Sequence, residues 1–238
     1  VRGGAELSDK IRSSASLNYA RSNFSFVPTG QGATVYNYVL QTPRDIPLLE
    51  LEDINNPFND LEGYYSEFTN NPWYVLKEFG SKAVIDRLYG NVELNYKANN
   101  WLSFTGRLGS DVARTEWEQW IPVAVIEGPN SGNSNPGNYS VQNIYTREIN
   151  SDLLMNINKD LGTDLNLSAF IGWNVNQREG NTLFSQINDL VIPAFYNLAN
   201  SANAPTSTTN ITKRRLIGAL AQATLSFKDY LFLTLSGR

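Results

Sequence analysis

A two-residue alternation of apolar and polar side chains, sustained over long segments, most constrains the fold of this chain. In "NVELNYKANNWLSFTGRLGSD" (residues 91–111), Val92, Leu94 and Phe104 have one parity, and Glu93 and Asn95 have the other. Successive side chains of a strand point to opposite faces. The segment therefore predicts a hairpin with one apolar and one polar face, and its apolar face needs a cover of either protein or lipid.

The same period recurs along most of the chain. Strands of globular proteins are usually about 5–6 residues long, and most of these candidates are about twice that or more. Two other stretches, 70–87 and 183–202, predict a short helix and a longer one. The predicted strands are 12–26, 85–98, 102–114, 141–159, 164–178, 213–227 and 231–238.

Short and long connections alternate between these strands. The short ones are "ANNW", "KDLGTD" and "FKDY", and the long ones span 27–84, 115–140 and 179–212. Links longer than about 12–15 residues are uncommon in compact domains. Long loops at one rim and short turns at the other are typical of transmembrane barrels. The sequence predicts an all-β fold, namely part of a large antiparallel transmembrane β-barrel with short periplasmic turns and long extracellular loops.

The short turns also predict a register. If Ala98 pairs with Leu102 and Phe227 pairs with Leu231, each loop contains three residues. An odd number of loop residues keeps the apolar residues of both strands on the same face. Three-residue hairpin loops of this kind are common. Trp101 and Tyr230 each occupy the third loop position, where a membrane rim favours aromatic rings.

Cations on the apolar faces are expected only near strand ends, because a cation at the bilayer midplane of a barrel costs about 2–4 kcal/mol. Within segment 12–26 the apolar parity changes between Tyr19 and Phe24, which predicts a bulge near Arg21. Segment 213–227 is ambiguous, since Leu216 and Leu220 oppose Ile217 in parity. The cations that fall on the predicted apolar faces are Arg114, Arg147, Lys159 and Arg215.

Composition excludes several function classes. The net charge is −4, which argues against nucleic acid as a partner. The chain has no Cys and no His, so thiolate or imidazole metal sites and His-dependent catalysis are excluded within it. Segment 53–63 lacks the carboxylate spacing of a calcium loop. Pairs such as Glu116 and Glu118 have the spacing of ordinary surface charge. We expect no enzyme activity, no metal and no cofactor.

Four motifs, in this order, resemble the barrel of SusC/RagA-type TonB-dependent outer-membrane transporters. They are "TPRDIPL" (42–48), "GYYSEFTNNPWYVL" (63–76), "DRLYGNVELNYKANNWLSFTGRLGSD" (86–111) and "KDYLFLTLSGR" (228–238). Each motif is short, and their order is the specific part. The alternative from another class is a soluble or surface-anchored β-sandwich that binds glycans.

The resemblance implies a barrel of about twenty-two strands in the bacterial outer membrane, together with an N-terminal plug domain. Residues 1–238 are then one partial barrel domain, an internal fragment without the plug and the remaining strands. It also implies a TonB complex that acts through the missing N-terminal region, a SusD-like surface lipoprotein, and active import of a bulky nutrient. Outer-membrane lipid is a further expected partner.

A transporter of this kind needs aromatic platforms beside hydrogen-bonding groups rather than catalytic pairs. The long connection 115–140 supplies Trp117, Trp120, Glu118 and Gln119, which we predict to contact an oligosaccharide or peptide ligand. The competing interpretation is that both tryptophans belong to an aromatic girdle or pack the loop onto its neighbours.

Overall fold

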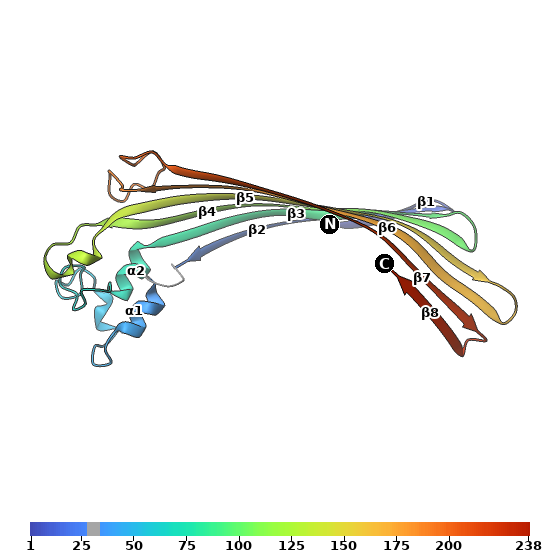
Figure 1. Ribbon diagram of the computed structural model, residues 1–238, viewed down its shortest axis with the longest axis horizontal. Coiled ribbons are helices and arrows are strands. Elements are labelled where there is room, and N and C mark those ends of the chain that lie inside the picture. Colours follow the sequence, from blue (N-terminus) through green and yellow to red (C-terminus); the bar gives the residue numbers. More distant parts are fainter. Residues whose placement is uncertain (28–33) are drawn as a thin grey trace.

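The protein forms one antiparallel sheet of eight strands, each paired with its neighbour in sequence (Figure 1). The computed structural model describes residues 1–27 and 34–238. The strands are β1 (Arg2–Ser8), β2 (Ile11–Phe26), β3 (Gly80–Lys97), β4 (Leu102–Ala124), β5 (Asn135–Asp160), β6 (Leu165–Asn188), β7 (Thr206–Phe227) and β8 (Leu231–Gly237). The predicted all-β antiparallel class is confirmed.

No second sheet covers either face within the described residues, because all eight strands belong to the same sheet. Leu94 is 47% exposed and Leu153 is 61% exposed. A sandwich would bury such residues between two sheets. The sandwich alternative is therefore not the architecture of this chain.

The sheet has two faces, which carry different residues. The outer face carries Leu94, Leu153 and every position that shares their side in the register, and the inner face carries Arg87 and Asp111. We call the end with the short turns the turn end. The loop end is the opposite end, where segments 34–79, 125–134 and 189–205 lie (Figure 1).

The three short turns are present, and the two registers predicted for them are confirmed. Ala98 donates its backbone N–H to the carbonyl oxygen of Leu102 at 3.0 Å, and Phe227 pairs with Leu231. In the last turn, Lys228 and Asp229 both have a positive φ, as a tight hairpin turn requires at its central positions.

Five of the predicted strands continue further toward the loop end, among them β3, which begins at Gly80, and β7, which begins at Thr206. β4 runs to Ala124, β5 begins at Asn135 and β6 runs to Asn188. The predicted long connections 115–140 and 179–212 therefore shrink to 125–134 and 189–205. The predicted longer helix in 183–202 is wrong. Leu183 to Asn188 instead pair with β5, and Ile187 is buried against Tyr139 and Leu190.

The predicted bulge near Arg21 is also wrong. Pairing of β2 with β3 runs without interruption from Ile11↔Tyr96 to Phe26↔Ser81. Leu17 and Tyr19 therefore lie on the outer face, and Phe24 and Phe26 lie on the inner face. The register also settles the faces of β7, which were ambiguous in the sequence. Ile217 pairs with Val175 on the outer face. The neighbouring Leu216 and Leu220 face inward.

The long connection between β2 and β3 folds into a small cap at the loop end. Residues 28–33 of this predicted connection lie outside the described part. The predicted short helix is present as α2 (Pro72–Glu78), and a second helix, α1 (Val35–Gln41), was not predicted. Two short 3-10 helices, η1 (Glu50–Glu52) and η2 (Gly128–Asn133), complete the loop end. None of the described helices has the length and apolar character needed to span a membrane.

Candidate functional site

The turn half of the outer face is a continuous band of uncharged side chains. In each long strand this band covers nine to eleven residues near the turn end. No outward position within it is Asp, Glu, Lys or Arg. The ranges are Ile11–Tyr19 in β2, Leu88–Tyr96 in β3, Leu102–Val112 in β4, Ile149–Ile157 in β5, Leu165–Val175 in β6 and Ile217–Phe227 in β7.

A row of charged side chains crosses the outer face directly beyond this band. Arg21, Asp86 and Arg114 are direct cross-strand neighbours, and the Arg21–Asp86 pair has an N–O distance of 3.8 Å. We call these three residues, together with Arg147, Glu179 and Lys213, the charged row. Arg147 and Glu179 are 2.6 Å apart.

The position of this row corrects the expectation that outward cations lie near strand ends. Arg114 is in the interior of β4 (Leu102–Ala124), and Arg147 is in the interior of β5 (Asn135–Asp160). The expectation failed because the strands extend further than their apolar patterns. Lys159 does lie at the turn end, where its Nζ is 5.0 Å from the centre of the Trp101 ring.

The inner face carries a network of amides and ion pairs. Arg87 pairs with Asp111, and Arg178 donates to Glu148 at 3.1 Å. Asn174 donates to Asp152 at 2.6 Å. Exposed ion pairs contribute little to stability, about 0–1 kcal/mol each. The network's main property is therefore a polar, hydrogen-bonding surface.

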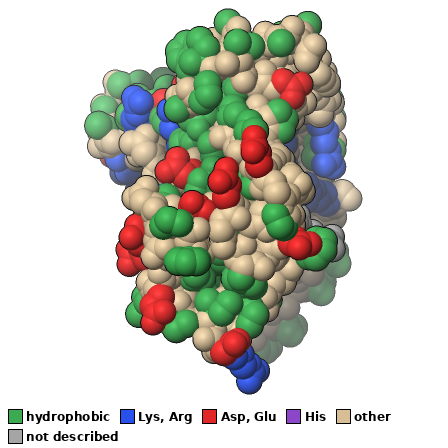
Figure 2. Space-filling model, turned by 90° about the vertical axis from the view of Figure 1, so that its left-hand side faces the viewer, with side chains coloured by type: hydrophobic (Ala, Val, Ile, Leu, Met, Phe, Trp, Pro, Cys, Tyr) green, Lys and Arg blue, Asp and Glu red, His purple; other side chains and the backbone are tan. Residues whose placement is uncertain are grey.

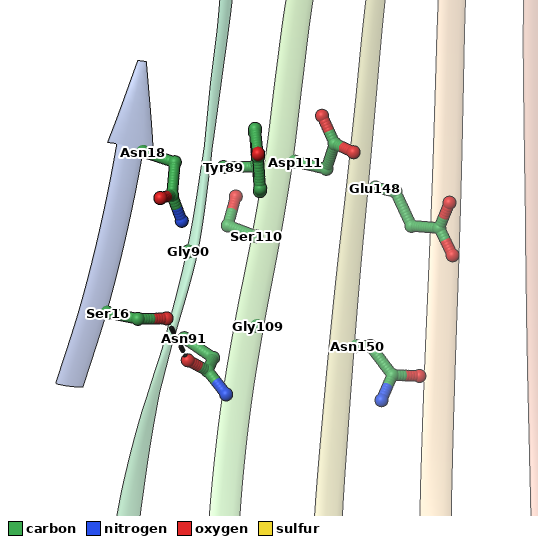
Figure 3. Close-up of a pocket in the computed structure, with 10 residues that line it drawn as sticks. All are labelled: Ser16, Asn18, Tyr89, Gly90, Asn91, Gly109, Ser110, Asp111, Glu148 and Asn150. Atoms are coloured by element: carbon green, nitrogen blue, oxygen red, sulfur yellow. Dashed lines mark hydrogen bonds between the residues drawn. The ribbon is translucent and has the colours of Figure 1, made fainter. Parts of the chain in front are cut away.

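An open depression of about 480 Å³ lies within this network (Figure 3). Gly109 has no side chain to fill it, and Ser16 donates a hydrogen bond to Asn91 beside it. The polar groups of Asp111 and Glu148 come from the neighbouring strands β4 and β5. The depression offers oxygen and amide groups on a wide, shallow surface rather than an enclosed pocket.

Three aromatic side chains form a platform on the loop half of the inner face. Phe24 and Phe26 stack with ring centroids 5.8 Å apart, and Phe26 lies 6.1 Å from Trp117. The Trp117 indole nitrogen donates to the hydroxyl of Ser81. The three rings are 44%, 43% and 38% exposed, in that order. Ala83 is the cross-strand neighbour of both Phe24 and Trp117 and is buried.

The four predicted ligand residues do not form one site. All lie within β4 rather than in a loop, so they alternate between faces. Trp117 and Gln119 are on the inner face, beside the platform. Glu118 and Trp120 are on the outer face, where Glu118 pairs with Lys82 at 3.1 Å. Sequence reasoning missed Phe24 and Phe26, although their change of parity was visible and pointed to the inner face.

Trp120 is held by a loop that folds back over the outer face. Its ring lies 5.5 Å from that of Tyr196 in segment 189–205 and packs near Tyr139. Trp120 also lies directly over Gly80, where an added Cβ would meet the indole at 1.9 Å. This arrangement agrees with the interpretation of Trp120 as a packing residue.

Two tyrosines at the loop end, Tyr74 in the cap and Tyr196 in segment 189–205, are both influenced by Glu78. Burial, aided by Glu78, raises the pKa of Tyr74 in α2 to about 12. The same two causes raise the pKa of Tyr196. Both phenols are therefore neutral at ordinary pH and pack as apolar rings.

The described residues contain no group of three or more acidic, His or Cys side chains placed to hold a metal ion. The inner face does offer hydrogen-bonding side chains and exposed aromatic rings.

Comparison with known proteins gives a likeness of fold. No family model and no curated protein matches the sequence. Among solved structures, a chain of the RagAB peptide transporter matches 98% of this chain with a TM-score of 0.74 and 12% identity. This chain has the fold of one section of a transporter barrel. Structures of the RagAB peptide importer in its closed-closed and open-open states match with TM-scores of 0.72 and 0.69, each at 13% identity.

The match covers 26% of the length of each of these chains. The eight strands thus correspond to about a quarter of a RagAB chain.

Proposed function

We propose that this chain is part of the barrel of a SusC/RagA-type, TonB-dependent active importer of a bulky nutrient in the bacterial outer membrane. One observation carries the proposal: a single sheet of very long strands has an uncharged outer band and a polar inner face. The fold shared with RagAB chains supports it. In this proposal residues 1–238 are one partial barrel domain, and the plug and the other strands belong to the rest of the protein.

The outer band fits contact with lipid tails. Trp173 is 55% exposed and Ile171 is 53% exposed, and both lie within the band. Exposed apolar patches larger than a few hundred Å² are rare on soluble monomers and mark interaction surfaces. In a barrel wall the alternation of apolar outward and polar inward positions has this cause.

The inner face fits the passage of a peptide or an oligosaccharide. The platform of Phe24, Phe26 and Trp117 offers exposed rings, and Gln119 lies beside it with an amide that can donate and accept. We assign ligand contact to Trp117 and Gln119, joined by Phe24 and Phe26. The activity named for the RagAB structures favours a peptide. Trp120 and Glu118 lie on the other face and are assigned to packing and surface charge.

The loop end fits a protein partner, for which we propose a SusD-like surface lipoprotein. Segment 34–79 contains eight acidic and two basic residues, and acidic and apolar side chains are interspersed over this end (Figure 2). Phe58 is 80% exposed and Phe68 is 86% exposed. A partner surface with apolar pockets and basic residues complements this chemistry. The TonB complex would act through the N-terminal region that lies outside this chain.

The proposal is tested by nutrient uptake in cells that carry the full-length protein. We expect radiolabelled peptides to accumulate in a TonB-dependent manner. Trp117→Ala is expected to lower uptake at subsaturating peptide about fivefold, which corresponds to the loss of about 1 kcal/mol of ring contact.

Trp173→Ala is the matched control, because it removes a tryptophan from the outer band and leaves the inner face intact. Its uptake should equal that of the unmodified protein when the amounts in the outer membrane are equal. Recovery of the protein in the soluble fraction, or accumulation that is unchanged without TonB, would overturn the proposal.

A further inference from the structure

The outer face changes character at one level along every long strand. On the turn side of this level, outward positions are uncharged in β2 through β7, except for Lys159 at the turn end of β5. On the loop side they include the charged row, followed by Glu116 and Glu118 in β4. Charged positions are directly paired from β2 to β4 (Arg21↔Asp86↔Arg114) and from β5 to β7 (Arg147↔Glu179↔Lys213). Between β4 and β5 the row shifts by two residues, because Arg147 pairs with Val112. It is therefore a feature of the whole wall rather than of one strand.

The height of the uncharged band can be compared with that of a bilayer. Nine to eleven residues at about 3.3 Å per residue and a tilt of about 40° span about 23–28 Å along a barrel axis. The hydrocarbon-facing band of such barrels is about 25 Å tall, and a spanning strand needs about 9–11 residues. The uncharged band thus matches one membrane crossing from the turn end to the charged row.

The strands are far longer than this crossing. β5 has 26 residues and β6 has 24. A strand of that length spans about 60 Å along a barrel axis at the same tilt. More than half of β5 therefore lies beyond the uncharged band, on the side of the loop end.

We propose that the charged row marks the outer limit of the membrane hydrocarbon, at the level of the lipid headgroups, and that the wall continues beyond it into the extracellular space. The partner is lipid: acyl chains cover the band, and polar headgroups meet the row. This inference rests on the proposed function, since it assumes that the outer face contacts a membrane.

Side-chain chemistry at both limits supports this placement. At the outer limit, Arg215 donates to Gln177 at 2.8 Å and adds a further cation beside the charged row, and cations suit the phosphates of lipid headgroups. At the turn end, Lys159 lies over Trp101, an arrangement that suits the interface because amphipathic rings and long cationic side chains both favour it.

This placement has a consequence for the ligand. Trp117 lies three residues beyond Arg114 in β4, and Phe24 lies three residues beyond Arg21 in β2. The aromatic platform is then above the hydrocarbon, in the extracellular part of the channel. A ligand would meet these rings before it reaches the membrane plane.

The test uses single cysteines that carry a nitroxide spin label, introduced into the full-length protein in lipid vesicles. This chain has no native cysteine. Leu153→Cys and Ala219→Cys place labels in the band. Asn143→Cys and Asn181→Cys place labels outward on the loop side of the charged row. Asn150→Cys, which faces inward, is the control for general water access.

The readout is relaxation of the label by oxygen, which concentrates in acyl chains, and by a water-soluble nickel complex. We expect the band labels to respond to oxygen, and the labels at Asn143 and Asn181 to respond to nickel. Oxygen-dominated relaxation at Asn143 and Asn181 would overturn the proposed limit while leaving the barrel intact. Nickel-dominated relaxation at Leu153 and Ala219 would overturn both this inference and the proposed function.

Discussion

Trp117 and Trp120 lie three residues apart in β4 and face opposite sides of the wall. Trp117 joins Phe26 on the inner face, whereas Trp120 lies over Gly80 on the outer face. One is exposed on a surface that a ligand can reach, and the other is packed beneath Tyr196. The two side chains should therefore fail in different ways when they are removed.

Replacement of each tryptophan by alanine separates ligand contact from packing. Trp117→Ala should lower uptake and leave the folding of the loop end unchanged. Trp120→Ala should destabilise the packing of segment 189–205 by about 1–3 kcal/mol, less than the cost at a fully buried site. Limited proteolysis of that segment in the purified protein measures the second effect. Equal protease resistance of both variants would contradict the assignment.

Gly80 is predicted to be intolerant of a side chain. A Cβ at this position would meet the Trp120 ring at 1.9 Å, so Gly80→Ala must displace the indole. The expected result is faster proteolysis within 189–205, as for Trp120→Ala. Gly106→Ala is the matched control in the same pair of strands, because its Cβ would meet no atom within 4 Å. Similar proteolysis rates for the two glycine variants would count against this packing.

Asn71 is predicted to hold the cap together. It is fully buried, its amide donates to the carbonyl oxygens of Leu51 at 2.7 Å and Asn59 at 2.9 Å, and its oxygen accepts from the N–H of Trp73. Asn71→Ala leaves those buried groups without partners, at a cost of about 2–4 kcal/mol.

Hydrogen exchange across segment 50–79 measures this cost. Asn71→Ala should accelerate exchange in the segment. The control is Asn55→Ala, because Asn55 is exposed in the same connection and should leave exchange unchanged. Protection that persists in Asn71→Ala would show that other contacts carry the cap.

Charge insertion should depend on height. Leu153→Arg places a cation in the middle of the outer band and should cost about 2–4 kcal/mol of stability in a bilayer. Asn143→Arg places the same cation on the loop side of the charged row and should cost about 0–1 kcal/mol. Urea titration of refolding into lipid vesicles compares the two. Equal penalties would mean that the two positions share one environment.

Much of the turn half was predictable from sequence. Its alternation is regular because apolar and polar surroundings stay on fixed sides of the sheet over nine to eleven residues. The turns followed from the same parity, as the pairing of Ala98 with Leu102 illustrates. These features depend on local pattern, which is fully contained in the sequence.

The loop half was not predictable in the same way, because there apolar side chains lie on the inner face as well and charged side chains lie on the outer face. Beyond Arg21 the outer face carries charge and the inner face carries Phe24 and Phe26, so the apolar parity reverses while the register does not. In the sequence, this reversal of parity is the same pattern that a β-bulge would produce. The loop-side ends of β4 and β6 were missed because the loop around Tyr196 covers part of the outer face there. Residues under this loop do not follow a simple alternation of apolar and polar side chains. Helix α1 has only seven residues and gives a weak periodic signal.

The central claim is that lipid covers the outer face and that the inner face lines a channel. Photo-crosslinking in outer membranes tests it most directly, with a diazirine amino acid placed at Leu153 or at Asn150 of the full-length protein. Asn150 and Leu153 lie three residues apart in β5 and face opposite sides of the sheet. The account predicts phospholipid adducts at Leu153 and none at Asn150. Lipid adducts at Asn150, or protein adducts alone at Leu153, would contradict it.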